Sequence, residues 1–286
     1  MNNKLDKPMN GKICMVTGAT SSIGEVTARE LAKQGATVIV VGRNPEKCMA
    51  TVNKIQQQTC NSNVDFILAE LSSQKEIRQL AQQFQSRYQR LDVLVNNAGA
   101  VYLKRKESID GIEMTFAVNC LSHFLLTNLL LDTLKASAPA RIINVSALLH
   151  KRAKIDFNDL ENRKNYRGWN VYMQTKLANL LFTYELSRRL NSTGVTVNAL
   201  HPGVLASNLG MNNSGIMRLI KSLVNVLLTS PEKGALTMIY LASSPEVEGI
   251  TGKYFIKKKA TASSKASYDK DAASRLWRIS AEMTRL

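Results

Sequence analysis

The sequence feature that most constrains the fold is an alternation, repeated along the chain, of short apolar segments with longer segments of helical spacing. The short segments are rich in Val and Ile, as in Thr37 to Val41, which is typical of strands buried on both faces of a sheet. The helical segments between them predict that neighbouring strands run parallel. The chain is therefore predicted to have an α/β fold with a doubly wound, mostly parallel sheet of about seven strands, flanked by helices.

Most of the chain can be assigned to these two kinds of segment. The predicted strands are residues 13–17, 37–41, 64–68, 93–95, 141–145, 196–200 and 254–255. The predicted helices are residues 26–33, 45–58, 74–88, 111–136, 169–192, one beginning near residue 231, and 269–283. Nothing between them has the composition of a linker. The 286 residues are therefore predicted to form a single domain, with a core over about 11–256 and a C-terminal loop and helix over 257–286.

A glycine-bearing turn, Gly18 to Gly24, joins the first predicted strand to the first predicted helix. In that context the exposed amides and the helix N-terminus can cradle a pyrophosphate, which makes the sheet Rossmann-type. Ligands of such sheets bind at the carboxyl ends of the strands. The residues that fall at those ends here are Gly18, Arg43, Leu71 and Asn97.

Tyr172 and Lys176 lie four residues apart in the predicted helix 169–192, so their side chains share one face. A free tyrosine titrates near ~10 and is a poor acid or base at neutral pH. A close ammonium that stabilises the phenolate by roughly 4 kcal/mol would lower this pKa by about three units. The pair is a candidate proton-transfer unit, although the same spacing also fits a core aromatic beside a solvated charge.

The formal net charge of +16 could attract phosphates, nucleic acid or an anionic surface. The cations are spread along the chain and are not interleaved with aromatics, so we expect no specific nucleic-acid partner and at most peripheral attraction to anionic surfaces. No run of 18 apolar residues predicts a membrane span, and the polar N-terminus does not read as a signal peptide. We therefore expect a cytoplasmic protein with reduced cysteines. The three histidines show no metal-ligand spacing, and no metal is expected.

In sequence order these motifs resemble the short-chain dehydrogenases/reductases, in their single-domain branch. The resemblance covers about residues 11–255 and rests on Thr17-Gly18 to Gly24, Asn96-Asn97-Ala98-Gly99, Asn119, Ser146, and Tyr172 with Lys176. The runs 117–124, 141–146, 201–203 and 251–255, together with Leu276-Trp277, are most similar to retinol-dehydrogenase-type members.

The resemblance implies hydride transfer between a nicotinamide cofactor and a carbonyl or alcohol, with four catalytic residues. Tyr172 would protonate the carbonyl oxygen as general acid, and Lys176 would lower the tyrosine pKa and hold the nicotinamide ribose. Ser146 would orient the substrate oxygen by a hydrogen bond, and Asn119 would help hold a water that relays protons to Lys176.

The resemblance also implies which residues contact the cofactor. They are Gly18, Thr20, Ser21, Ser22, Ile23, Gly24, Arg43, Asn44, Glu70, Leu71, Asn97, Ala98, Gly99, Tyr172, Lys176, Pro202, Gly203, Val204 and Ser207. Ser22 replaces the family's usual glycine, where a side chain would crowd the pyrophosphate. Glu70 replaces the usual aspartate at the adenine, and Ser207 replaces a threonine near the carboxamide.

The end of the second predicted strand favours NADP(H) over NAD(H). A site for the unphosphorylated cofactor has an Asp or Glu there to accept the ribose hydroxyls. This chain has Gly42 at that place and Arg43 next, with Asn44 as a further donor. Arginine offers paired donors to a 2′-phosphate, although Arg43 is also one of many surface cations.

The segment after His201 predicts the substrate class. Between His201 and Ser230 the chain has no Asp or Glu, and apolar residues there would form a lid over a lipophilic, retinoid-, steroid- or fatty-aldehyde-like carbonyl. An ordinary amphipathic surface helix explains this pattern nearly as well. The predicted pocket residues are Leu148, Leu205, Leu209, Met211 and Met217.

Two other functions remain open from sequence alone. One is an extended-branch sugar-nucleotide epimerase or dehydratase, which the short C-terminal region disfavours. The other is a non-catalytic NADP(H)-binding scaffold or sensor. Because helices 111–136 and 169–192 are largely apolar, and relatives commonly pair them, a homodimer or homotetramer that buries both helices is also predicted.

Overall fold

The computed structural model describes residues 7–203 and 229–286, and its centre is an eight-stranded sheet in the order β3-β2-β1-β4-β5-β6-β7-β8. All neighbouring strands run parallel except the β7–β8 pair, which is antiparallel. The strands are β1 (Ile13–Thr17), β2 (Thr37–Gly42), β3 (Val64–Leu68), β4 (Val93–Asn96), β5 (Ala140–Val145), β6 (Val195–His201), β7 (Lys253–Ile256) and β8 (Lys259–Ala260). The predicted fold class is confirmed.

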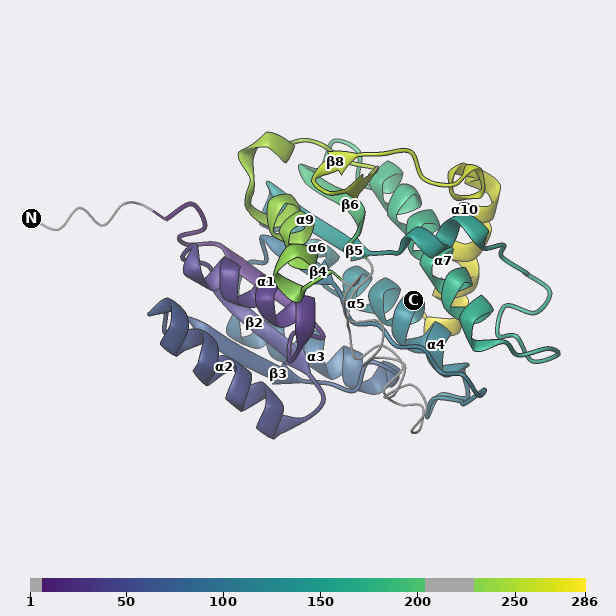
Figure 1. The fold of residues 1–286 in the computed structure, drawn as a ribbon, viewed down its shortest axis with the longest axis horizontal. Coiled ribbons are helices and arrows are strands. Elements are labelled where there is room, and N and C mark those ends of the chain that lie inside the picture. Colours follow the sequence, from purple (N-terminus) through teal and green to yellow (C-terminus); the bar gives the residue numbers. More distant parts are fainter. Residues whose placement is uncertain (1–6, 204–228) are drawn as a thin grey trace, which may run out of the picture.

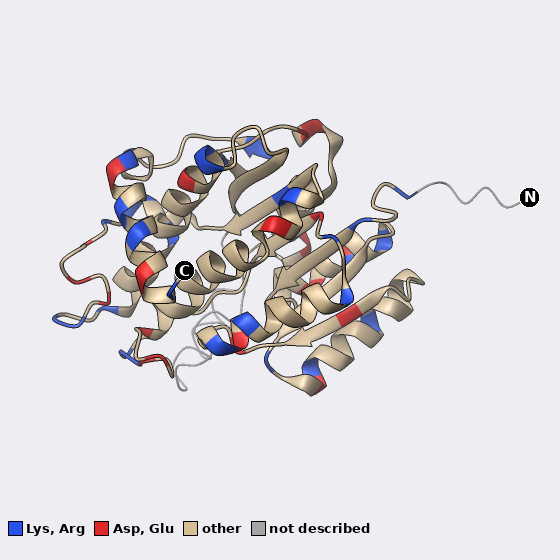
Figure 2. Ribbon diagram, turned by 180° about the vertical axis from the view of Figure 1, so that it is seen from behind, with Lys and Arg blue, Asp and Glu red and all other residues tan. Residues whose placement is uncertain are grey.

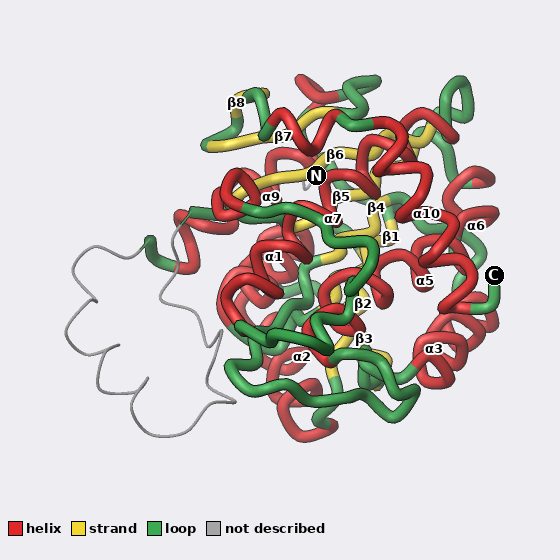
Figure 3. Tube along the Cα trace, turned by 90° about the vertical axis from the view of Figure 1, so that its right-hand side faces the viewer, coloured by secondary structure: helices red, strands yellow, loops and turns green. Residues whose placement is uncertain are grey.

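Helices cover both faces of this sheet (Figure 1). They are α1 (Ser22–Lys33), α2 (Pro45–Thr59), α3 (Gln74–Arg87), α4 (Met114–Phe116), α5 (Ser122–Leu129), α6 (Leu131–Ala136), α7 (Gly168–Arg189), α9 (Pro231–Ser243) and α10 (Lys270–Thr284). Figure 3, seen from the end, shows the strands between α1, α2 and α9 on one side and α3, α5 and α10 on the other. The strand order reverses between β1 and β4, so their carboxyl ends open toward a crevice where a ligand can bind.

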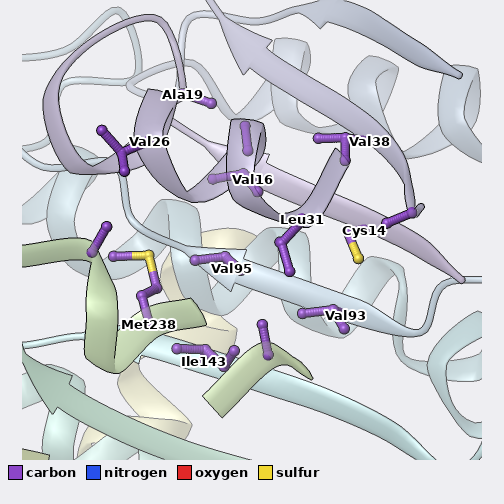
Figure 4. Packing of buried hydrophobic residues seen from close by; sticks show 14 of the residues in the cluster. Cys14, Val16, Ala19, Val26, Leu31, Val38, Val93, Val95, Ile143 and Met238 are labelled. Carbon is purple, nitrogen blue, oxygen red and sulfur yellow. The ribbon is translucent and has the colours of Figure 1, made fainter. Parts of the chain in front are cut away.

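Each face of the sheet has its own apolar core. Figure 4 shows one of them, in which Val16 of β1 and Val38 of β2 pack with Leu31 of α1 and Met238 of α9. The other core joins the sheet to α3, α5 and α7, with Phe84 among its fully buried side chains. Because both faces are covered, the central strands β1, β4 and β5 are buried along most of their length and are mostly apolar, as expected for buried parallel strands.

The helix predicted over residues 111–136 is not continuous. It begins at Met114, after the Glu113 carboxylate accepts hydrogen bonds from the Thr115 and Phe116 amides, and it contains a π-helical turn at Ala117–Leu121. Leu130 then leaves helical geometry and separates α5 from α6. A π turn inserts one residue into the helix and is common at functional sites. Here it holds Asn119.

The final helix, α10, packs against α7 and α5. The Trp277 ring stacks on Phe182 of α7 at 5.8 Å and meets Phe124 of α5 edge-on at 4.9 Å. Arg189 at the end of α7 lies 4.2 Å from the centre of the same indole ring. The surface predicted to pair with a second copy of the chain is thus occupied, at this place, by the chain's own C-terminal helix.

Positive charge is distributed over many elements. Lys and Arg lie on most of the helices visible in Figure 2, with Asp and Glu among them. Among the described residues, no helix is both long and apolar enough to cross a membrane.

Candidate active site

The turn between β1 and α1 is built around close backbone contacts. A Cβ atom placed on Gly24 would lie 2.4 Å from the Gly18 carbonyl oxygen and 2.6 Å from Asn97 Nδ2, so only glycine fits. Gly18 itself has a left-handed backbone with φ of 63°. The Asn97 side chain donates to the carbonyls of Thr17 and Gly18 at 2.8 and 3.2 Å. The residue expected to touch the cofactor therefore ties the turn after β4 to the turn after β1.

Ser22 begins α1 and occupies the place where glycine was expected. Its backbone is left-handed, with φ of 53°, which is the conformation that glycine adopts without strain. Its hydroxyl oxygen is buried, and no described group forms a hydrogen bond with it. A buried hydroxyl without a partner costs free energy, and a phosphate oxygen arriving at the N-terminus of α1 would satisfy it. The turn thus fits a dinucleotide despite the substitution.

The end of β2 carries no acidic side chain, because its last residue is Gly42. A Cβ atom there would lie 2.7 Å from both Cys48 Sγ and the Thr20 methyl group, so a larger residue would require these side chains to shift. Arg43 follows, and its Nη1 donates to Glu70 Oε2 at 3.1 Å. The Glu70 partner is the first cause of the raised pKa of Arg43.

Asn44 serves α2 in addition to any role at the cofactor. Its side-chain oxygen accepts from the Lys47 amide at 2.8 Å and caps the helix, and Pro45 opens the first turn.

The other predicted cofactor residues lie at the same edge of the sheet. Thr20, Ser21 and Ile23 lie in or beside the glycine turn, Leu71 follows β3, Ala98 and Gly99 follow β4, and Pro202 and Gly203 follow β6.

Tyr172 and Lys176 are both buried in α7. Lys176 Nζ lies 5.4 Å from the centre of the Tyr172 ring and donates to the Val145 carbonyl at 3.1 Å. Burial lowers the pKa of Lys176 to about 8 and raises the pKa of Tyr172 to about 12. In the protein alone, the pKa of Tyr172 is therefore not lowered as expected. Desolvation disfavours the phenolate, and this effect outweighs the attraction of Lys176, whose own pKa is lowered and whose ammonium donates to Val145. Tyr172 is therefore protonated at neutral pH and holds the proton that a general acid must give, although the raised pKa makes it a weaker acid than a free tyrosine.

Lys176 fits a cofactor ribose. An ammonium has three donors, and within the described part of the chain Lys176 donates one hydrogen bond, to Val145. Gly99 leaves space beside it, because a Cβ atom there would lie 3.6 Å from Lys176 Nζ and 3.5 Å from Asn119 Oδ1. A nicotinamide riboside would supply acceptors for the remaining donors and, when bound, the hydride.

Ser146 and Asn119 lie beside this pair but bond to the backbone. The Ser146 hydroxyl, at the end of β5, donates to the Lys176 carbonyl at 2.7 Å, so it must rotate to donate to a substrate oxygen. Asn119 Oδ1 accepts from the Ala100 amide at 2.7 Å, and its Nδ2 donates to the Ala100 carbonyl and to Thr175 Oγ1. Asn119 thereby joins the loop after β4 to α7, and its expected role in holding a water stays a prediction.

Tyr172 contacts residues that the sequence did not single out. The Trp169 ring meets the Tyr172 ring edge-on at 6.0 Å, and 46% of the Trp169 residue is exposed. Its position three residues before Tyr172 on one helix face was the available signal. Val101 and Ala147 pack against Tyr172, and the predicted pocket residue Leu148 is exposed beside them. The residues Val204, Leu205, Ser207, Leu209, Met211 and Met217 lie outside the described part of the chain.

Within residues 7–203 and 229–286 no cluster of three or more His, Cys, Asp or Glu is placed to hold a metal ion. His123, which lies on α5 near Lys176, is fully buried, and its Nε2 lies 3.0 Å from the Ala98 carbonyl oxygen. Burial lowers its pKa to about 3, so it is a neutral core residue rather than an acid or base at neutral pH.

An open parallel sheet, a glycine turn after its first strand and a buried Tyr–Lys pair at the same edge define a dinucleotide-binding oxidoreductase. A family model described as short chain dehydrogenase matches residues 12–215. The chain belongs to this family, whose members bind a nicotinamide cofactor and act on small molecules.

Individual relatives agree with this assignment. Retinol dehydrogenase 13 of Homo sapiens is 44% identical over 283 residues, which covers 96% of this chain and 85% of the relative. An uncharacterised protein from Mycobacterium paratuberculosis has a structure that matches with a TM-score of 0.79 at 31% identity, over 98% of this chain and 96% of that one. The RhlG/NADP active-site complex of Pseudomonas aeruginosa matches with a TM-score of 0.70 at 27% identity, over 87% of this chain and 96% of that one.

Proposed function

We propose that this chain is an NADP(H)-dependent oxidoreductase that transfers hydride between the nicotinamide and a lipophilic carbonyl or alcohol, such as a retinoid, a steroid or a fatty aldehyde. The observation that carries the proposal is the buried Tyr172 phenol, which lies beside Lys176 at the carboxyl edge of the sheet. Tyr172 donates its proton to the carbonyl oxygen in reduction and takes it back in oxidation.

The residues around Tyr172 support this division of roles. Lys176 holds the ribose, and its charge offsets the phenolate that forms when Tyr172 gives up its proton. Ser146 turns from the Lys176 carbonyl to the substrate oxygen and fixes its direction. Asn119 holds the loop after β4 in place, so that Gly99 leaves space beside Lys176.

Two features of the β2 end support NADP(H). Residue 42 is glycine, so no acid stands there to repel a 2′-phosphate. Arg43 is exposed at the next position and carries the planar donors that bind phosphate well. The similar RhlG structure is named as a complex with NADP, which agrees with this choice.

The lipophilic substrate is supported by the side chains near Tyr172 and by the named relatives. Trp169 and Leu148 expose apolar surface beside the tyrosine, and such surfaces are typical of pockets for apolar ligands. Relatives with more than two fifths of their residues identical are named as retinol dehydrogenases. The cytoplasmic location expected from the sequence stays a prediction.

A screen of retinoid, steroid and aliphatic aldehydes, ketones and alcohols with both cofactors tests the proposal, with absorbance of the reduced nicotinamide as the readout. We expect turnover with NADPH, and higher kcat/KM for long apolar carbonyls than for short ones. Cofactor binding without turnover of any carbonyl would favour the scaffold alternative. Turnover with NADH at equal kcat/KM would overturn the choice of NADP(H).

A further inference from the structure

We propose that Glu70 sets the strength of 2′-phosphate recognition by competing for Arg43, which makes it a specificity-determining residue for the cofactor. The inference rests on the proposed use of NADP(H) and goes beyond it. Arg43 already forms an ion pair with the Glu70 carboxylate. To bind the cofactor phosphate, Arg43 must divide its donors between the phosphate and Glu70, or release Glu70.

The carboxylate of Glu70 is held from both sides. Its Oε1 accepts from the Ser72 amide at 3.1 Å, while its Oε2 accepts from Arg43 Nη1 at 3.1 Å. The Glu70 amide donates to Glu76 Oε2 at 2.7 Å, which fixes the backbone at this point. The chain just after β3 thus presents a fixed negative charge to the side chain that follows β2.

The pairing affects the geometry that recognises phosphate. A guanidinium binds phosphate most strongly with two parallel N–H donors, and Glu70 engages one of the two Nη groups of Arg43. A 2′-phosphate would also bring a second anion close to the Glu70 charge, and like charges at such range repel. Both effects weaken the binding of NADPH. NADH has no 2′-phosphate, so neither effect changes its binding.

The Arg43–Glu70 ion pair is partly exposed to solvent, so we expect it to have a moderate effect on NADPH binding. The side chains of Arg43 and Glu70 are 59% and 33% exposed, so solvent screens their interaction. We therefore expect removal of the Glu70 charge to tighten NADPH binding by about 3- to 10-fold, the range of one partly screened charge interaction.

The test measures dissociation constants by fluorescence titration with NADPH and NADH, and by calorimetry with adenosine 2′,5′-bisphosphate and 5′-AMP. Glu70→Gln removes the charge and keeps an acceptor for the Ser72 amide. Asp65→Asn is the matched control, because Asp65 lies on β3, the strand that Glu70 follows, and forms its own ion pair with Arg87 rather than with Arg43. Arg43→Ala and the double variant complete a mutant cycle.

We expect Glu70→Gln to tighten the binding of NADPH and of the bisphosphate, and to change the dissociation constants of NADH and 5′-AMP by no more than about twofold. In the Arg43→Ala background, Glu70→Gln should have no effect on binding. Equal weakening of all four ligands would mean that Glu70 only contacts adenine, and would overturn the proposal. Weaker binding of NADPH alone would overturn it too, since Glu70 would then position Arg43 for the phosphate. Because these are binding measurements, they separate this proposal from a failure of hydride transfer.

Discussion

At the scale of single residues, the chemistry depends on the Tyr172 hydroxyl. Tyr172→Phe removes the proton donor and retains the buried ring, so kcat for carbonyl reduction should fall by about 10²- to 10⁴-fold while NADPH affinity stays nearly unchanged. Single-turnover kinetics with a separate NADPH titration would measure both. Tyr240→Phe, on α9 across the sheet, is the control and should retain activity. Wild-type turnover by the Tyr172→Phe variant would show that another group supplies the proton.

The low pKa of Lys176 predicts a pH dependence of cofactor binding. Burial lowers this pKa from 10.5 to about 8, so the ammonium is present below about pH 8 and is lost as the pH rises through that value. We expect the dissociation constant for NADPH to increase about 2- to 10-fold above pH 8, the contribution of hydrogen bonds to one neutral ribose. Lys176→Met should bind more weakly at every pH and lose this step. A binding curve without a step between pH 7 and 9.5 would contradict the assignment.

Ser146, Tyr172 and Lys176 show which features of the site the sequence could predict and which it could not. Residue spacing placed Tyr172 and Lys176 on one face of a helix, and the family resemblance added Ser146 to the same predicted site. It could not predict that the Ser146 hydroxyl bonds to the Lys176 carbonyl, or that Glu70 pairs with Arg43. Those contacts depend on side-chain rotamers and on burial, which spacing along the chain does not specify.

At the scale of elements, the turn between β1 and α1 tolerates substitution poorly, because its backbone contacts are close. Gly24→Ala places a methyl group 2.4 Å from the Gly18 carbonyl oxygen, and the turn must shift to relieve the contact. We expect a loss of about 1–3 kcal/mol in the free energy of unfolding, together with weaker NADPH binding. Chemical denaturation and titration of the same samples would measure both. Ser21→Ala is the control for stability only, since the Ser21 side chain makes no capping hydrogen bond. Unchanged stability in the Gly24→Ala variant would mean that the turn has room to spare.

The elements themselves were predictable where one local signal dominated. The strands β1 and β3 match their predicted bounds. For β1 the signal is a short, almost fully buried run of mostly apolar residues. The π turn at Ala117–Leu121 was missed, since an apolar segment gives no sign of one inserted residue. The strand β8 was missed as well. Its turn uses Lys257 and Lys258 with φ of 50° and 64°, where glycine or asparagine would have signalled a hairpin.

At the scale of the whole molecule, α10 connects the C-terminus to the catalytic helices. Trp277 packs between Phe124 of α5 and Phe182 of α7, while Arg78 and Gln74 of α3 donate to the carbonyls of Thr284 and Met283 at its end. The sequence predicted both the tail helix and the apolar surfaces of the helices that it covers. It did not predict that one covers the other, because a contact distant in sequence leaves no periodic signal. The homo-oligomer expected to bury both helices stays a prediction, and α10 covers the part of that surface around Phe124 and Phe182.

Removal of Trp277 would test which surface mediates self-association. Trp277→Ala takes away an indole ring that two aromatic side chains and Arg189 contact, so unfolding should become easier by about 2–4 kcal/mol. With α10 loosened, the apolar surface of α7 is exposed part of the time, and light scattering should show a larger mass than for the wild type at equal concentration. Ser274→Ala on the exposed side of α10 serves as the control and should leave both quantities unchanged. If the wild type already forms a dimer whose cross-links join α7 of one copy to α7 of the other, α10 does not block this surface, and the helix pairing expected from the sequence is restored.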